Sequence, residues 1–383
     1  MAFALCLPQI SLSGTDALCA LVEQLRLQPA RNPLIVTEKA LMQLGLHDTL
    51  ISQLQMQGFD PVIFDGVIAN PTDHVVAHAL ACYQQHYCDC IIGFGGGSAM
   101  DTAKVVRALI ANPDKQVHDL EGIGHVQKIG PLLVCISTTS GTAAEVTSNA
   151  VITDTRRHVK MVIIDSAIIP DIAVNDPTLL LGLPADVTAA TGMDALTHAI
   201  EAYVSTAAHP LTDHSALAAI KIITKALPKA VQNGQDLAAR EQMTNGQFLA
   251  GMAFNSAGLG LVHSLAHQPG ATHNLPHGVC NAILLPILCE FNREVRTQRF
   301  ADIAQAMGVD TQKMDEQQAS KAAIAAIRHL SEQVGIPSGL GALAIKETDI
   351  ERWIAPALGD PCGGSAPRSA TAEQIRALYL QAL

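Results

Sequence analysis

The pattern of apolar residues changes once along this chain of 383 residues, close to Leu183 and Pro184. Before that point, short apolar and β-branched runs alternate with helical stretches, as in parallel strands that helices cover on both faces. After it, long stretches rich in Ala, Leu, Ile, Glu and Lys follow. We therefore expect an α/β domain with a parallel sheet over residues 1–183 and an all-α domain over residues 184–383. The expected strands lie at residues 33–37, 61–64, 90–94, 131–136, 160–164 and 172–174.

Composition excludes several classes of protein. Hydrophobic residues make up 49% of the chain and charged residues 15%, which is typical of a globular enzyme and not of a disordered chain. The net charge is −11 and Lys and Arg do not cluster, so we expect no nucleic-acid partner. The start lacks a basic signal-peptide region, and the apolar run at residues 279–289 is too short to cross a bilayer. We predict no membrane partner.

The nine cysteines are scattered, without the spacing of a disulfide scaffold. This pattern fits a reducing compartment, so we predict a cytoplasmic protein. Cys88 and Cys90 could be read as a metal or redox pair, but they precede an apolar strand, and we interpret them as small buried hydrophobic residues.

Four of the fifteen histidines fall within one short segment, residues 263–277. His263 and His267 are four residues apart and would point the same way from a helix. We expect the Pro–Gly pair at 269–270 to end that helix. Pro276 can stand in the first turn of the next helix, which would bring His277 back toward His263. The segment therefore predicts two helices that converge on one point.

A second pair, Asp194 and His198, has the same spacing in a predicted helix over residues 191–203. A single pair of this kind more often packs or caps than binds a metal, but two pairs together favour a metal site. One carboxylate and three imidazoles suit Fe(II) or Zn(II) better than Mg(II), which prefers oxygen alone, or Cu(I), which prefers sulfur.

A glycine-rich turn joins the expected strand at 90–94 to a helix, through Gly95, Gly96, Gly97 and Ser98. Glycines let backbone N–H groups approach an anion, and the helix start adds its positive dipole end, so the turn predicts a pyrophosphate site. We expect Ser98 to be the N-cap. A second turn, at residues 137–145, offers hydroxyl groups at the same sheet edge.

The position of the acidic residue relative to the glycine-rich turn differs from that in an ordinary Rossmann unit. The acidic residue usually expected about twenty residues after the glycines is not obvious, whereas Glu38 precedes them by about sixty. Because this nucleotide-like turn falls in the first half of the chain and the metal-ligand pairs in the second, we expect the active site between the two domains.

Together, these residues resemble the iron-containing alcohol dehydrogenases over nearly the whole chain. The matching motifs lie at residues 95–104, 138–145, 190–201, 258–267 and 276–278. The resemblance implies a dehydroquinate synthase-like architecture, with an N-terminal dinucleotide-binding domain, a helical metal-binding domain, one divalent iron per subunit, and commonly a dimer.

The resemblance also implies roles for individual residues. His267 becomes a candidate proton relay beside the nicotinamide, and His273 has no role. The implied ligands of the iron are Asp194, His198, His263 and His277. The implied contacts to the cofactor are Glu38, Asn70, Gly95, Gly96, Gly97, Ser98, Asp101, Thr138, Thr139, Thr142, Asn149 and Lys160.

Two positions depart from close relatives. Glu38 stands where they often carry Asp, and either carboxylate would bind the ribose hydroxyls of NAD and repel the extra phosphate of NADP. Ala366 stands where the family usually has Asn, which we expect to alter a local turn.

The expected function is that of an NAD(H)-linked alcohol dehydrogenase or aldehyde reductase. Hydride would pass between nicotinamide and a short primary alcohol, diol or aldehyde at Fe²⁺, with Zn²⁺ as the other candidate metal. Ala253, Phe254 and Leu259 precede His263 and would wall a small pocket. Two alternatives are an NAD- and metal-dependent lyase or cyclase like dehydroquinate synthase, which would need a more basic pocket, and a non-catalytic NAD-binding protein with structural histidines.

Overall fold

The computed structural model describes residues 3–383, which form two compact units. One comprises Cys6–Thr139 and Ala143–Leu180, and the other comprises Leu181–Leu383 with residues 3–5 and Ser140–Thr142. The main division lies close to the boundary predicted at residue 183. The short turn at Ser140–Thr142 groups with the helical unit because Gly141 packs on Thr191, whose Cβ would lie 2.7 Å from a Cβ added at 141.

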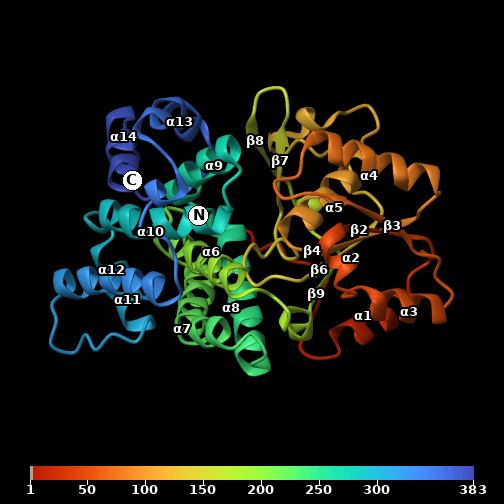
Figure 1. Ribbon diagram of the computed structural model, residues 1–383, viewed down its shortest axis with the longest axis horizontal. Helices are drawn as coiled ribbons and strands as arrows, with labels where there is room; N and C mark the ends of the chain where they lie inside the picture. Colours follow the sequence, from red (N-terminus) through yellow and green to blue (C-terminus); the bar gives the residue numbers. More distant parts are fainter. Residues whose placement is uncertain (1–2) are drawn as a thin grey trace. The chain divides into compact units, whose positions relative to one another are not determined.

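The first unit alternates strands and helices (Figure 1). Its elements are β1 Ile10–Ser13, α1 Ala17–Arg26, β2 Pro33–Glu38, α2 Lys39–Gln43, α3 Asp48–Met56, β3 Val62–Val67, α4 Asp73–Gln85, β4 Cys90–Gly95, α5 Gly97–Ala111, η1 Val117–Leu120, β5 Gly122–Ile123, β6 Leu132–Ser137, β7 Asn149–Asp154, β8 Val159–Ile164, η2 Ser166–Ile168, β9 Ile172–Asn175 and η3 Pro177–Leu180.

A six-stranded parallel sheet forms the centre of this unit, in the order β1-β9-β6-β4-β2-β3. Successive residues of its inner strands enter opposite cores: Leu34 and Ile91 pack with α4 and α5, and Ile35 and Ile92 pack with α1 and α3. Figure 1 shows these helix pairs on opposite faces of the sheet. The parallel sheet covered on both faces, predicted from the apolar runs, is therefore confirmed.

Two details of the sheet differ from the prediction. Strand β1 was not predicted, because its four residues alternate in burial and give no continuous apolar run. Strand β8 does not extend the main sheet; it pairs antiparallel with β7 and parallel with β5 in a separate three-stranded sheet. In β7 every second side chain is only partly buried, a pattern that suits a sheet with one open face.

The second unit is helical, as predicted. Its elements are α6 Ala185–Val204, α7 Pro210–Gln232, α8 Leu237–Ala257, α9 Leu261–His273, α10 His277–Arg293, α11 Thr297–Ala306, α12 Glu316–Gln333, η4 Leu340–Leu343, α13 Glu347–Gly359, η5 Pro361–Ser365 and α14 Ala372–Gln381.

Helix α9 corrects one prediction: it does not end at Pro269 and Gly270 but continues to His273. A proline inside a helix leaves the carbonyl four residues earlier without its usual N–H donor. Here that carbonyl belongs to Leu265, and it accepts a hydrogen bond of 2.8 Å from the hydroxyl of Tyr379 on α14. The hydroxyl of Tyr379 thus supplies the donor that Pro269 lacks, and α9 continues past the proline.

Over residues 3–383, no single helix is long and apolar enough to cross a membrane, although α8 and α9, bent by 105°, pass that test together. The nine cysteines are free. Cys88 and Cys90 are buried, which confirms their interpretation as small core residues. Burial raises the pKa of the Cys88 thiol to about 11.

Candidate metal centre and nucleotide-binding edge

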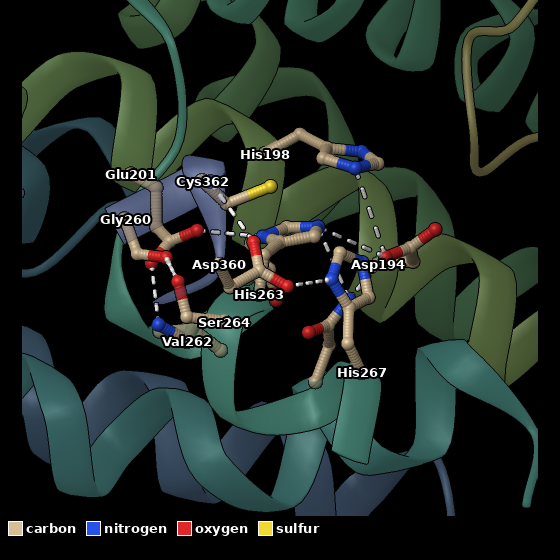
Figure 2. A network of polar contacts seen from close by, with 12 residues as sticks. Asp194, His198, Glu201, Gly260, Val262, His263, Ser264, His267, Asp360 and Cys362 are labelled. Atoms are coloured by element: carbon tan, nitrogen blue, oxygen red, sulfur yellow. Dashed lines mark hydrogen bonds and ion pairs between the residues drawn. The ribbon is translucent and has the colours of Figure 1, made fainter. Parts of the chain in front are cut away.

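Three helices bring the four predicted metal ligands together. Asp194 and His198 lie one turn apart on α6, His263 lies in the first turn of α9, and His277 is the first residue of α10. Oδ1 of Asp194 lies 3.8 Å from Nε2 of His198 and 3.7 Å from Nε2 of both His263 and His277. Figure 2 shows His198 and His263 facing Asp194.

Asp194, His263 and His277 each place one ligand atom within 4.8 Å of the other two, which fits a divalent iron or zinc ion, and His198 approaches this group through Asp194. Imidazole nitrogen and carboxylate oxygen bind such ions at about 2.0–2.2 Å, so two ligands of a tetrahedral site lie about 3.4 Å apart. The separations from Asp194 are a few tenths of an ångström longer than this. They are also too long for hydrogen bonds, so the imidazoles converge on the carboxylate without bonding to it.

The pKa shifts of Asp194 and His198 favour the protonation states that bind a metal. Burial raises the pKa of Asp194, but the three histidines outweigh it and hold the pKa well below its usual range. Burial lowers the pKa of His198 to about 4, against the attraction of Asp194. At neutral pH the carboxylate is therefore charged and His198 is neutral, the forms that bind a metal.

Aromatic and apolar side chains cover one side of the cluster. The ring of Phe254 stacks on His198 with centroids 4.3 Å apart, and His198 stacks on His263 at 4.6 Å. Ala253 and Leu259 are buried on the same stretch of chain. These contacts fix the imidazole planes.

His267 is one turn beyond His263 on α9 but is engaged elsewhere. Its Nδ1 lies 2.7 Å from Oδ2 of Asp360, and its ring stacks on His277 with centroids 5.3 Å apart. Burial raises the pKa of Asp360, but His267 and the backbone N–H of Cys362 lower it to about 2. His267 thus lies beside the metal ligands with its Nδ1 held by a charged carboxylate.

Two other residues of the sequence analysis lie away from the cluster. Nε2 of His273 is 3.6 Å from Asp349 and 3.1 Å from Arg352, so it takes no part in the metal centre. Ala366 is the C-cap of η5, with φ −59° and ψ 140°.

In the α/β unit, the predicted phosphate turn lies at the carboxyl edge of the sheet. The neighbouring strands β2, β4 and β6 end at Glu38, Gly95 and Ser137. The backbone N–H of Thr138 donates to the carbonyl of Gly95 over 3.0 Å. A Cβ at Gly95 would lie 3.9 Å from Oε1 of Glu38, so this carboxylate is beside the turn. Burial raises the pKa of Glu38.

The start of α5 corrects a second prediction. Gly96 is the N-cap, and Ser98 is the second residue of the helix. The helix begins early because Gly95, with φ 155°, turns the chain in a conformation that glycine allows. The N–H groups of Gly97 and Ser98 have no acceptor within the helix and are available to an anion. Thr139 is next to Gly96, its Cγ2 lying 3.4 Å from a Cβ added there.

Other predicted cofactor residues lie on or near the β7–β8 hairpin. Asn149 and Lys160 share the partly exposed face of this hairpin. Oδ2 of Asp101 accepts from the N–H of Val151 over 2.9 Å, and Lys104 donates to the carbonyl of Asn149 over 2.8 Å. Burial raises the pKa of Asp101 to about 6. Asp101 and Lys104 therefore tie the hairpin to α5.

Asn70 follows β3 in a left-handed conformation, with φ 54°. Thr142 lies in the turn that groups with the helical unit. The cofactor contacts of these residues, like those of the hairpin, stay predictions.

Two family models match the chain, iron-containing alcohol dehydrogenase over residues 8–177 and the C-terminal part of the Fe-containing alcohol dehydrogenase family over residues 188–383. The chain belongs to the iron-containing alcohol dehydrogenases. The predicted family resemblance and fold class are thereby confirmed, and this dehydrogenase is an oxidoreductase.

Individual relatives match over almost their full length. The NAD-dependent methanol dehydrogenase of Bacillus methanolicus is 42% identical, over 98% of this chain and 99% of its own. The lactaldehyde reductase of Escherichia coli K12 is 41% identical, over 99% of both chains. The crystal structure of a 1,3-propanediol oxidoreductase superimposes with a TM-score of 0.97 at 41% identity, covering all of both chains.

Three polar residues of this alcohol dehydrogenase were given no role by the sequence analysis. Asp360 contacts His267 from a segment far along the chain, and Nδ2 of Asn281 lies 2.7 Å from Oδ1 of Asp194. Glu201 contacts His263. Glu201 and Asn281 gave usable signals: Glu201 is seven residues after Asp194 on α6, and Asn281 is four residues after His277 on α10, in each case on the same helix face.

Proposed function

We propose that this chain is an NAD(H)-linked alcohol dehydrogenase and aldehyde reductase that binds one Fe²⁺ through Asp194, His198, His263 and His277. The convergence of three Nε2 atoms on Oδ1 of Asp194, at 3.7–3.8 Å, carries the proposal. Zn²⁺ fits the same donor set, so the metal found after purification will depend on supply.

The bound metal supplies Lewis acidity that polarises the oxygen of the alcohol or aldehyde. The protein orients the reactants and handles the proton. Glu38 and the amides of Gly97 and Ser98 would hold the adenosine and pyrophosphate of NAD, and Glu38 favours NAD over NADP by charge. His267, with Nδ1 on Asp360, is placed to exchange a proton through Nε2.

The substrate class we propose is a short primary alcohol, diol or aldehyde. Phe254 stacks on His198, and Ala253 and Leu259 are buried nearby, which favours small apolar groups beside the ligands. The names of the relatives point the same way, to methanol, 1,3-propanediol and lactaldehyde.

We also propose a homodimer or higher homo-oligomer in the cytoplasm. Membership of the family supports the oligomer, and nine free cysteines without a disulfide support a reducing compartment. Light scattering and cell fractionation test the two proposals.

The deciding experiment removes the metal anaerobically, restores Fe²⁺ or Zn²⁺ separately, and follows NADH absorbance with short alcohols, diols and aldehydes. We expect turnover that depends on metal and NAD. Absence of turnover with both metals would favour the lyase or the non-catalytic alternative.

A further inference from the structure

The carboxylate of Glu201 is buried against the start of α9 and binds two donors there. It is 3% exposed. Oε1 accepts from the backbone N–H of Val262 over 2.7 Å, and Oε2 lies 2.6 Å from Nδ1 of His263 (Figure 2). One side chain of α6 therefore satisfies an amide in the first turn of α9 and contacts the imidazole next to it.

Gly260 makes room for this arrangement. A Cβ at position 260 would lie 2.7 Å from Oε1 of Glu201 and 3.2 Å from its Cδ. Any larger residue would push the carboxylate away from Val262 and His263. The space at Gly260 is thus matched to the position of the carboxylate.

The contacts on the other ring nitrogen are consistent with a proton on Nδ1 of His263. The carboxylate of Asp194 can only accept hydrogen bonds, so the amide group of Asn281 that lies 2.7 Å from it is the NH₂. That same NH₂ lies 3.1 Å from Nε2 of His263 and 3.0 Å from Nε2 of His277, and its two hydrogens can serve at most two of Asp194, His263 and His277. Nε2 of His263 thus faces a donor group, while the carboxylate of Glu201, which only accepts, receives the proton of Nδ1 over 2.6 Å.

We propose that Glu201 is a positioning residue: it fixes His263 in the tautomer with the proton on Nδ1, so that the lone pair of Nε2 faces the other ligands. This inference rests on the proposed metal-dependent function. Asp194, His198 and Glu201 occupy positions i, i+4 and i+7 of α6, so a single helix face provides two ligands and orients a third.

The sharpest test is Glu201→Gln, which keeps size and shape but has one acceptor and one donor group. If the amide oxygen faces Val262, the NH₂ faces Nδ1 of His263 and the ring must carry its proton on Nε2, where it cannot bind a metal. If the amide is reversed, its NH₂ faces the backbone N–H of Val262, and two donors then face each other without an acceptor. We expect the dissociation constant for Zn²⁺, measured by competition with a chelator, to rise about 10- to 100-fold.

A second readout follows the tautomer itself. ¹⁵N NMR of the metal-free protein, recorded above pH 9, should show the His263 proton on Nδ1 in the wild type and on Nε2 in Glu201→Gln. Burial lowers the pKa of this ring, but Asp194 and Glu201 raise it to about 9, so the ring is neutral only above that pH. A purely structural role for Glu201 would leave the tautomer unchanged.

Asp302→Asn is the matched control. Asp302 accepts a 2.7 Å hydrogen bond from the hydroxyl of Tyr203, two residues after Glu201 on α6, and touches no ligand. The substitution makes the same change of charge, and Zn²⁺ affinity should stay within about twofold of the wild type. Gly260→Ala, which retains the carboxylate but crowds it, should weaken Zn²⁺ binding and decides the question if Glu201→Gln does not fold.

The outcomes separate the two proposals. Tight Zn²⁺ binding by Glu201→Gln, with the His263 proton still on Nδ1, overturns the role of Glu201 and leaves the proposed function standing. A wild-type protein that binds neither Zn²⁺ nor Fe²⁺ overturns both.

Discussion

Nδ1 of His267 lies 2.7 Å from Oδ2 of Asp360, and both side chains are almost completely buried. Because Asp360 receives the Nδ1 proton, the proposed exchange of a proton with the substrate would use Nε2 of His267. We predict that His267→Ala lowers kcat at least about tenfold and leaves metal content unchanged.

Asp360→Asn should lower kcat in the same direction, and the double variant should lose no more than His267→Ala alone, since the two residues act as one unit. Steady-state kinetics of the three variants, with metal analysis, provide the check. Unchanged turnover of His267→Ala across the pH range would show that it is not the relay.

His263→Ala should remove metal and activity together while the fold survives. The variant deletes one of four ligands, and we expect retained metal to fall at least about tenfold. Metal analysis and circular dichroism measure the two effects. A variant that is inactive but keeps its full metal content would contradict the ligand assignment.

Gly278 sets how closely α10 approaches α6. A Cβ there would lie 2.3 Å from the carbonyl oxygen of Ala190 and 3.3 Å from Cβ of Asp194. Gly278→Ala should therefore cost about 1–3 kcal/mol of stability and weaken metal binding, because it pushes His277 away from Asp194.

Gly359→Ala is the control for this change. Nothing lies within 4 Å of a Cβ at 359, so stability should change by no more than about 0.5 kcal/mol. Chemical denaturation and Zn²⁺ titration of both variants measure the difference. Equal stability and equal Zn²⁺ affinity of the two variants would mean that α10 can move away from α6 without cost.

Glu38→Ser should relax the preference for NAD. The carboxylate lies beside the glycine turn at Gly95, where it would repel the additional phosphate of NADP. We expect the ratio of kcat/KM for NADP to kcat/KM for NAD to rise about tenfold or more. This corresponds to a loss of about 1.4 kcal/mol or more in the preference for NAD over NADP. Glu23→Ser, an exposed change on α1, is the control and should leave the ratio as it is.

Thiol reactivity should follow burial. Cys6 and Cys19 are exposed, whereas Cys135 is fully buried, and burial raises its pKa to about 12. Raising the pH from neutral to mildly alkaline should speed the reaction of the exposed pair with a disulfide reagent, since the thiolate is the nucleophile. Cys135 should react only after unfolding. Its early modification in the native protein would show local opening of β6.

The convergence of the four proposed ligands could be predicted from sequence because helical spacing is local. Asp194 and His198 are four residues apart, as are His263 and His267, so each pair points the same way from one helix. Pro276 predicts the start of a new helix, and hence the change of chain direction before His277. The choice of His263 and not His267 as a ligand came from the family resemblance and stays a prediction. Local spacing treats the two alike, and the contact that distinguishes them, from Asp360 to His267, comes from far along the chain.

Two of the errors have the same origin. Pro269 predicts a helix end by local rules, and β8 predicts another strand of the main sheet by its apolar run. In each case a distant partner decides the outcome, the hydroxyl of Tyr379 for α9 and the antiparallel pairing with β7 for β8. The error about Ser98 as the N-cap has a local cause. The conformation of Gly95 lets the helix start before Ser98, with Gly96 as the N-cap.

The bond from Tyr379 to the carbonyl of Leu265 also changes how the end of the chain should be regarded. Leu265 stands midway between His263 and His267, so the turn that bears both histidines depends on a hydroxyl from α14. A truncation or fusion that displaces α14 would leave that carbonyl without its donor. A truncation at the end of the chain would then disturb the helical turn that bears His263, one of the proposed metal ligands.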